Sequence, residues 1–294
     1  MKRLAVIGLL VASAVRADAV AYGDAKGDPL KSPAGVACTA EGRVVLADSG
    51  NGRLLTYAFT GGALVAGATI KFPELGVPVR LQIDSRGNLL SLDAKTRRIV
   101  RVGEEGKFGG FVAPKGVPPA AGFFPVSFKL DKEDNLYLLD VASARVVVLD
   151  KSGGFVRQVA EPKGATFSDI AVDAKGAVLA VDGPHAAVYA DGVLLSRVKE
   201  YASFPSYITV TPQGLIVLVD NHGNGLVVLG ADGAYLGRRL SIGWTEGLIY
   251  YPEQICIDAK GNTFVADRGN HRLQAFAPQS SGPATQDRSN GQNP

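Results

Sequence analysis

Residues 255–273 read ICIDAKGNTFVADRGNHRL, and five other segments of the chain align with them without a gap. These copies begin at Val36, Leu81, Phe128, Ile170 and Ile208. All six copies carry the same acidic residue near the end, which is Asp48, Asp93, Asp140, Asp182, Asp220 or Asp267. A small polar residue stands nine positions earlier, as Thr39, Asp84, Asp131, Asp173, Thr211 or Asp258. Successive copies start 38 to 47 residues apart, so the chain repeats one supersecondary unit six times.

Each copy alternates short β-rich runs with tight-turn residues, as in RVVLAD from Arg43 and RLLTYAF from Arg53. Turn sequences such as Ala-Glu-Gly and Ser-Arg-Gly place a glycine where the backbone needs a positive φ. Four antiparallel strands repeated at this spacing make a propeller blade. The sequence therefore predicts an all-β, six-bladed β-propeller of four-stranded antiparallel blades over residues 20–277.

The repeats resemble the NHL family. The last copy carries the resemblance best, in the text IDAKGNTFVADRGNHRLQAF, and the likeness extends over about residues 30–277. The resemblance implies the propeller fold. It leaves function open, because NHL propellers include enzymes, sensor domains and binders of protein or RNA.

The last copy stops after its third strand, at Ala277, whereas residues 20–30 precede the first complete blade. A ring of blades leaves an exposed edge unless the two ends of the chain meet. We therefore expect residues 20–26 to pair as the outer strand of the last blade and so to close the ring.

The two ends of the chain differ from the repeats. Lys2 and Arg3 precede an apolar run from Leu4 to Val15, and residues 1–19 are interpreted as a signal peptide cleaved after Ala17 or Ala19. An uncleaved membrane anchor is the alternative. Residues 278–294 hold no large apolar side chain and are predicted to be a disordered tail. Export to the periplasm or to the extracellular or outer surface follows from this interpretation.

The charge balance excludes some partners. The chain has 31 basic and 28 acidic residues, and the predicted leader holds three of the basic ones. The mature chain is therefore almost neutral, which gives no support for nucleic-acid or anionic-membrane binding. No second apolar stretch is long enough to span a membrane.

The repeated Asp is interpreted as structural, because a functional site would occur once rather than in all six copies. Four arginines lie five residues after their Asp: Arg53, Arg98, Arg145 and Arg272. We expect each to form an Asp–Arg pair across the loop that follows the second strand.

The sequence assigns no catalytic residue, metal ligand or cofactor. His185, His222 and His271 stand at different offsets from the repeated Asp, unlike the zinc ligands of NHL-type amidating lyases. Asp169, Glu253 and Gln254 come just before two innermost strands and could lie near the channel mouth, but surface polarity explains them equally well. A metal-dependent hydrolase or lyase of the lactonase or amidating-lyase kind remains the alternative function.

Aromatic residues gather in the connectors between blades. Phe72, Phe124, Phe204 and Tyr251 each precede a proline and are expected mostly to fill the space between blades. The remaining candidates for partner contact are Phe123, Tyr201, Arg239, Trp244 and Tyr250. We therefore predict a non-enzymatic, exported binding or scaffold protein that docks a protein partner of the cell envelope through its connector loops. The family resemblance suggests accessories of envelope complexes, multihaem cytochrome systems among them.

Cys38 and Cys256 are the two cysteines of the chain. They fall on the predicted innermost strands of the first and last blades, which become neighbours when the ring closes. A disulfide across the closure and two buried free thiols are both open alternatives.

Overall fold

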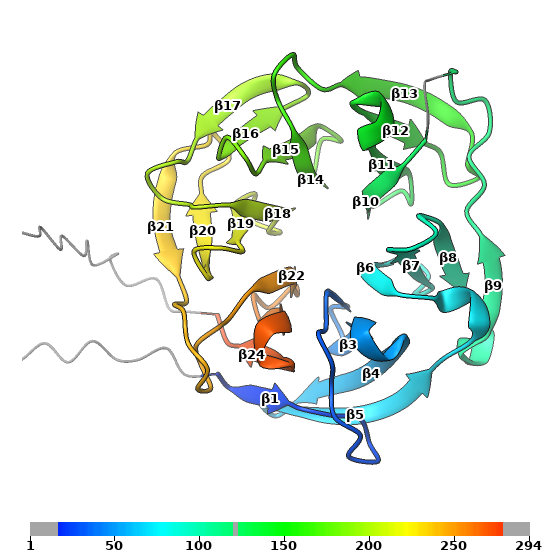
Figure 1. The fold of residues 1–294 in the computed structure, drawn as a ribbon, viewed down its shortest axis with the longest axis vertical. Helices are drawn as coiled ribbons and strands as arrows, with labels where there is room; N and C mark the ends of the chain where they lie inside the picture. Colours follow the sequence, from blue (N-terminus) through cyan, green and yellow to red (C-terminus); the bar gives the residue numbers. More distant parts are fainter. Residues whose placement is uncertain (1–16, 120–122, 279–294) are drawn as a thin grey trace, which may run out of the picture.

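A computed structural model describes residues 17–119 and 123–278 of the chain. Over these residues the protein is a six-bladed β-propeller, in which six four-stranded antiparallel sheets surround a central axis (Figure 1). The predicted fold is confirmed. Residues 1–16 of the predicted signal peptide and residues 279–294 of the predicted tail lie outside the described residues.

The strands follow the repeats in order. Blade one comprises β2 (Gly35–Cys38), β3 (Arg43–Asp48), β4 (Arg53–Thr60) and β5 (Ala63–Ile70). Blade two comprises β6 (Pro78–Ile83), β7 (Leu89–Asp93), β8 (Ile99–Val102) and β9 (Phe108–Phe111). Blade three comprises β10 (Pro125–Leu130), β11 (Leu136–Asp140), β12 (Arg145–Leu149) and β13 (Phe155–Ala160).

The second half of the ring has the same plan. Blade four comprises β14 (Phe167–Val172), β15 (Val178–Asp182), β16 (Ala187–Ala190) and β17 (Val193–Arg197). Blade five comprises β18 (Pro205–Val210), β19 (Ile216–Asp220), β20 (Gly225–Leu229) and β21 (Tyr235–Arg239). Blade six comprises β22 (Pro252–Ile257), β23 (Thr263–Asp267), β24 (Arg272–Phe276) and, from the other end of the chain, β1 (Ala19–Ala21). The helices of the described residues are short 3-10 turns, such as Arg268–Asn270.

Burial explains why the middle strands read as continuous apolar runs. All five residues of β11 and of β19 are buried, because neighbouring blades cover both faces of each sheet. The outer strand β21 is mostly exposed and reads YLGRR. The core therefore consists of apolar layers between successive blades, as where Val181 and Val188 of blade four pack with Ile208 and Leu218 of blade five.

The ring is closed by the N-terminal segment, as predicted. β1 pairs antiparallel with β24, with Ala19 opposite Ala275 and Ala21 opposite Leu273 (Figure 1). The predicted bounds of 20–26 were wrong, because the chain leaves blade six after Ala21.

Contacts with blade one explain why this strand is short. The carboxylate of Asp24 pairs with the Arg53 guanidinium at 2.8 Å, and the Tyr57 hydroxyl donates a hydrogen bond of 2.8 Å to the Gly23 carbonyl. Both partners lie on β4, so the segment crosses from blade six onto blade one. Cleavage after Ala17 would leave β1 whole, whereas cleavage after Ala19 would remove its first residue.

A disulfide also joins the first blade to the last. Cys38 ends β2 and Cys256 lies in β22, with their Cα atoms 5.9 Å apart and their sulfurs bonded at 1.99 Å. Of the two alternatives that the sequence left open, the structure contains the disulfide. The seam between blades one and six is thus closed at its inner edge by a covalent bond and at its outer edge by β1.

The disulfide predicts a stability difference. Its cysteines are 218 positions apart in sequence, so the bond restricts the unfolded chain strongly. Replacing both cysteines with alanine should lower the free energy of unfolding by about 2–4 kcal/mol, measured by urea denaturation of oxidised protein and variant. Thiol titration of the denatured, unreduced protein should detect no reactive thiol, and two reactive thiols per chain would contradict the assignment.

Candidate functional site

The propeller has two faces of different construction. Loops that join successive blades lie on the same face as the loops that follow the repeated Asp, and we call it the connector face. Turns between the first and second strands, and between the third and fourth, lie on the opposite side, the hairpin face. Both assignments follow from the antiparallel order of each blade.

The repeated Asp fastens the connector face. Each of its carboxylates accepts a hydrogen bond from a backbone N–H of the segment that enters the same blade. The donors are the amides of Lys31 (2.7 Å), Val77 (3.1 Å), Phe124 (2.8 Å), Thr166 (3.2 Å), Phe204 (2.8 Å) and Tyr250 (2.8 Å). We call this contact the Asp clasp. It recurs in all six blades, which supports the structural interpretation of the repeated Asp.

Three of the four expected Asp–Arg pairs are present. Arg53, Arg145 and Arg272 pair with their Asp at 2.6, 3.2 and 2.8 Å. The prediction that Arg98 pairs with Asp93 was wrong. Its guanidinium lies over the Phe111 ring at 3.2 Å, which leaves Thr96 to donate a 2.7 Å hydrogen bond to Asp93.

The other two blades use different partners. Arg238 of the outer strand β21 reaches Asp220 at 2.9 Å, and Nδ1 of His185 lies 2.9 Å from Asp182. The Asp clasp therefore tolerates several cationic or polar partners, provided that the connector amide is held.

A second column of the repeat differs in every blade. Thirteen positions before the repeated Asp stand Gly35, Arg80, Ser127, Asp169, Tyr207 and Gln254. In blades two to six this position is the third residue of the innermost strand. This column lies one residue before the start of each of the six aligned segments. Its variation is the signal that would have found the channel residues.

Three of these side chains meet in the central channel. The Ser127 hydroxyl and the Ile208 amide donate hydrogen bonds to the buried Asp169 carboxylate, the latter at 3.0 Å. The Lys129 ammonium lies 3.4 Å from this carboxylate and 3.7 Å from the centre of the Tyr207 ring. Blades three, four and five are thereby joined through a buried ion pair and a cation–π contact.

The opposite side of the channel is also polar. Arg80 lies 5.7 Å from the centre of the Tyr207 ring and 3.8 Å from Glu253, whose other oxygen accepts a 2.6 Å hydrogen bond from Arg268. The Gln254 side chain bonds both backbone groups of Leu81 in blade two. We call these residues, with Ser127, Lys129, Asp169 and Tyr207, the channel plug.

This placement corrects the surface interpretation of Asp169 and Gln254. Both lie inside innermost strands rather than before them, and both are buried. Each of the channel carboxylates, Asp169 and Glu253, has a cationic partner. A cavity of about 210 Å³ lies along the channel, with Lys129, Tyr207, Gln254 and the disulfide in its wall.

Aromatic side chains form a continuous row on the connector face of blades five and six. Phe204 stacks on His222 at 4.8 Å, His222 meets Tyr251 at 6.3 Å, and Tyr251 meets Tyr250 at 4.6 Å. Trp244 completes the row, with its ring 5.7 Å from Tyr250. We call these five residues the aromatic band. Trp244 is 71% exposed, so the band ends in a ring that faces solvent.

Backbone contacts hold the band in place. Tyr251 has a φ of +47°, an unfavourable conformation for a bulky residue, and its amide donates a 2.6 Å hydrogen bond to the Asn224 side chain. The Tyr250 amide is held by the Asp clasp of blade six. The Trp244 carbonyl accepts a 2.9 Å hydrogen bond from Arg272, which itself pairs with Asp267.

The five predicted contact residues do not all lie together. Trp244 and Tyr250 belong to the aromatic band. Tyr201 stacks on Tyr235 at 3.7 Å, beside the outer strand of blade five, and Arg239 is exposed at the end of that strand. Phe123 is exposed at the entry to blade three, across the ring from blade six.

The expectation for the rings that precede proline was wrong for two of the four. Phe124 and Tyr251 are 43% and 42% exposed, whereas Phe72 and Phe204 are partly buried. Arg97 covers the Phe124 ring at 4.7 Å. Tyr251 is turned outward by its positive φ, which the dipeptide sequence Tyr-Pro does not predict.

The histidines lie in separate surroundings. Nδ1 of His271 accepts a 2.9 Å hydrogen bond from the Ser32 amide, His185 contacts Asp182, and His222 stacks in the aromatic band. Over residues 17–119 and 123–278, no three His, Cys, Asp or Glu side chains are grouped as metal ligands. The same ranges contain no helix that is long and apolar enough to cross a membrane.

Comparison with known proteins agrees with the repeat and the fold. The family model of the NHL repeat matches residues 250–276, which cover most of blade six. This match and the six blades of one plan support an NHL-repeat propeller. A search of curated proteins found no significant match in sequence.

Solved structures share the fold at low identity. A streptogramin B lyase is 14% identical, with a TM-score of 0.63, over 86% of this chain and 95% of its own. A gluconolactonase from Xanthomonas campestris is 13% identical, with a TM-score of 0.63, over 85% and 87%. A chain of a nidogen/laminin complex is 18% identical, with a TM-score of 0.57, over 71% and 80%. These likenesses concern the fold alone, which serves enzymes and binding proteins.

The Asp clasp predicts a pH dependence in blade two. Burial alone would raise the pKa of Asp93, but hydrogen bonds from the Lys95 amide, the Thr96 hydroxyl and the Val77 amide hold it below its ordinary value of 3.8. This carboxylate therefore stabilises the fold above pH 3.8, and the contribution is lost as the pH falls through the lower pKa of the folded state. Asp93→Asn should cost roughly 1 kcal/mol of unfolding free energy at pH 7, and the difference from the unmodified protein should shrink towards pH 3.

Asp267→Asn is the matched control for this experiment. Burial raises the pKa of Asp267 despite its hydrogen bonds, so the native state takes up a proton more readily than the unfolded chain. The stability difference between this variant and the unmodified protein should therefore change in the opposite direction as the pH falls. Urea unfolding at pH 7, 5 and 3 measures both differences. A difference for Asp93→Asn that stays constant or grows towards pH 3 would contradict the account.

Proposed function

We propose that this protein is a non-enzymatic binding protein of the cell envelope that docks a protein partner through the aromatic band. The main support for this proposal is the aromatic band, a row of neighbouring rings across two blades that ends in the exposed Trp244. Exposed aromatic side chains that are clustered and already ordered are typical anchors of protein interfaces.

The scaffold under the band supports this role. Trp244, Tyr250 and Tyr251 are each held by a backbone hydrogen bond to a side chain of blade five or six. Such positioning lowers the ordering entropy that a partner would have to offset on binding. Arg268 and Glu253 form an ion pair near the start of β22 and supply polar groups that an interface rim requires.

The chemistry of the band indicates what the partner presents. Phe204, Tyr250, Tyr251 and Trp244 offer ring faces and edges, while the Tyr22 hydroxyl bonds Glu246 beside them at 3.1 Å. The matching surface is a short apolar or aromatic segment with hydrogen-bonding groups at its margin. Export, and therefore an envelope partner, follows from the predicted signal peptide and is part of the proposal.

A metal-dependent hydrolase or lyase is the second candidate, and the fold shared with a lyase and a gluconolactonase favours it. The channel plug favours binding, because Asp169 and Glu253 are engaged by Lys129, Arg80 and Arg268 rather than turned towards a shared open position. Elemental analysis of the purified protein separates the two candidates. Stoichiometric zinc or calcium, lost when the channel carboxylates are replaced, would support the enzyme.

Replacing Trp244 and Tyr251 together with alanine tests the band. Capture of the envelope partner should weaken at least tenfold, because exposed aromatic anchors contribute about 1–3 kcal/mol each when truncated. The fold should survive, since both side chains are exposed and their backbone contacts remain. Pull-down from the native envelope identifies the partner, and its affinity for each purified variant gives the measurement.

Tyr235→Ala provides the matched control. Tyr235 is 40% exposed and also stacked on a tyrosine, but it lies at the outer edge of blade five. This variant should capture the partner as well as the unmodified protein. Equal loss in both variants, or undiminished capture by the Trp244 and Tyr251 variant, would refute the assignment of the band.

A further inference from the structure

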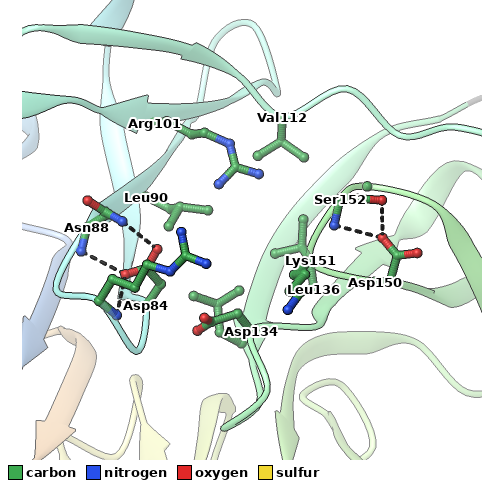
Figure 2. A pocket seen from close by; sticks show the side chains of 13 residues that line it. Asp84, Asn88, Leu90, Arg101, Val112, Asp134, Leu136, Asp150, Lys151 and Ser152 are labelled. Carbon is green, nitrogen blue, oxygen red and sulfur yellow. Dashed lines mark hydrogen bonds between the residues drawn. The ribbon is translucent and has the colours of Figure 1, made fainter.

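A pocket of about 280 Å³ lies between blades two and three (Figure 2). It opens on the hairpin face, whereas the aromatic band lies on the connector face. Asp84, Asn88 and Arg101 line it from blade two, and Asp134, Lys151 and Ser152 line it from blade three. The proposal drawn from this pocket is independent of the proposed function.

The carboxylates around the pocket are already occupied by backbone and hydroxyl donors. Asp84 accepts hydrogen bonds from the Arg86 and Asn88 amides at 3.0 and 2.8 Å. Asp150 holds its own turn in the same manner, through the Ser152 amide at 2.7 Å (Figure 2). These two carboxylates therefore serve to fix the turns that form the rim.

Asp134 links the two blades. Its oxygens accept hydrogen bonds from the amide and the hydroxyl of Ser85 at 2.8 and 2.6 Å. Burial would raise the pKa of Asp134, but these hydrogen bonds and the charges of Arg86 and Lys151 hold it below its ordinary value. The Asp134 carboxylate therefore joins blade three to blade two across the pocket, and both of its oxygens accept hydrogen bonds from Ser85.

The cations of the pocket lie near Asp134 but make no direct contact of this kind within the described residues. The charged groups of Arg86, Arg101 and Lys151 make no ion pair or hydrogen bond with another residue of the described ranges, in contrast to Arg53, Arg145 and Arg272. They come from three different elements: the β6–β7 turn, β8 and the β12–β13 turn. In Figure 2 the Arg101 guanidinium extends into the space between the two blades. Three cationic groups therefore converge on one concavity with no hydrogen bond or close ion pair to another described residue.

The floor between these cations is apolar. Leu90, Val112, Leu130 and Leu136 line the pocket, and Leu90 and Leu136 are themselves buried. An inorganic ion alone would leave this floor uncovered, whereas an uncharged apolar molecule would offer no acceptor to the N–H groups of Arg86, Arg101 and Lys151.

We propose that this pocket binds a small organic anion, a carboxylate or phosphate group carried on an apolar body. Arg101 provides the planar, two-pronged donor set that matches either oxyanion, and Arg86 and Lys151 add charge at the rim. The apolar body covers the leucine and valine floor. The volume of about 280 Å³ lies just below the usual range for ligand sites, so the ligand is about the size of one substituted ring.

Titration with simple probes tests the proposal. Benzoate and phenyl phosphate are added to the ¹³C-methyl-labelled full-length protein, and the methyl resonances of Val112, Leu90 and Leu136 are followed. Benzamide has the same ring without the charge, and inorganic phosphate has the charge without the ring. At least one organic anion should shift these methyl resonances saturably, with an affinity at least tenfold higher than that of benzamide or phosphate, and the affinity should fall as salt is added.

Two variants locate the site. Arg101→Gln should weaken binding of that anion at least tenfold, and the exposed double variant Arg86→Gln with Lys151→Gln should weaken it without disturbing the core. Lys260→Gln is the matched control, because Lys260 holds the same turn position in blade six as Arg86 does in blade two. It should leave the affinity unchanged. Equal binding of benzamide, equal binding of inorganic phosphate, no saturable shift, or affinities that neither variant lowers would each overturn the proposal.

Discussion

The structure depends on one contact made six times, between a buried carboxylate and the first backbone N–H groups of the blade that contains it. A buried charge is costly unless hydrogen bonds replace the water it has lost. In each blade the Asp meets this need with a connector amide and with a side chain such as Arg53, His185 or Arg238. The same hydrogen bonds fix where each connector begins, so the loops of the connector face are held by the core.

Conserved and variable positions of the repeat have different roles. Positions that are the same in all blades build the ring, while the chemistry lies where the blades differ. The column that contains Arg80, Asp169 and Tyr207 fills the channel with polar contacts that cross from blade to blade. The connectors of blades five and six carry the aromatic band, and the turns of blades two and three carry the cationic pocket. In each of these places, side chains from two or more blades combine into an arrangement that the described residues form once.

The repeat alignment was enough to predict the fold, the number of blades and the closure, because these depend on periodicity and on counting strands. It misjudged the end of β1, because Asp24 pairs with Arg53 and the Gly23 carbonyl bonds Tyr57 of blade one. Counting strands does not reveal such contacts between distant parts of the chain. Arg98 has the spacing of a clasp partner but finds the Phe111 ring instead. For the candidate sites, sequence indicated Trp244 and Tyr250 but not their continuation through Tyr251 and His222. That continuation depends on a positive φ and on rings that meet across two blades.

Native-state hydrogen exchange tests the central claim about the Asp clasp most directly. The amides of Lys31, Val77, Phe124, Thr166, Phe204 and Tyr250 lie in connecting segments, where exchange is ordinarily fast. If the clasp holds the connector face to the core, all six should exchange at least about a hundredfold more slowly than the amide of Gly61, at the tip of the β4–β5 turn. Exchange of these six amides at the rate of that turn would contradict the account.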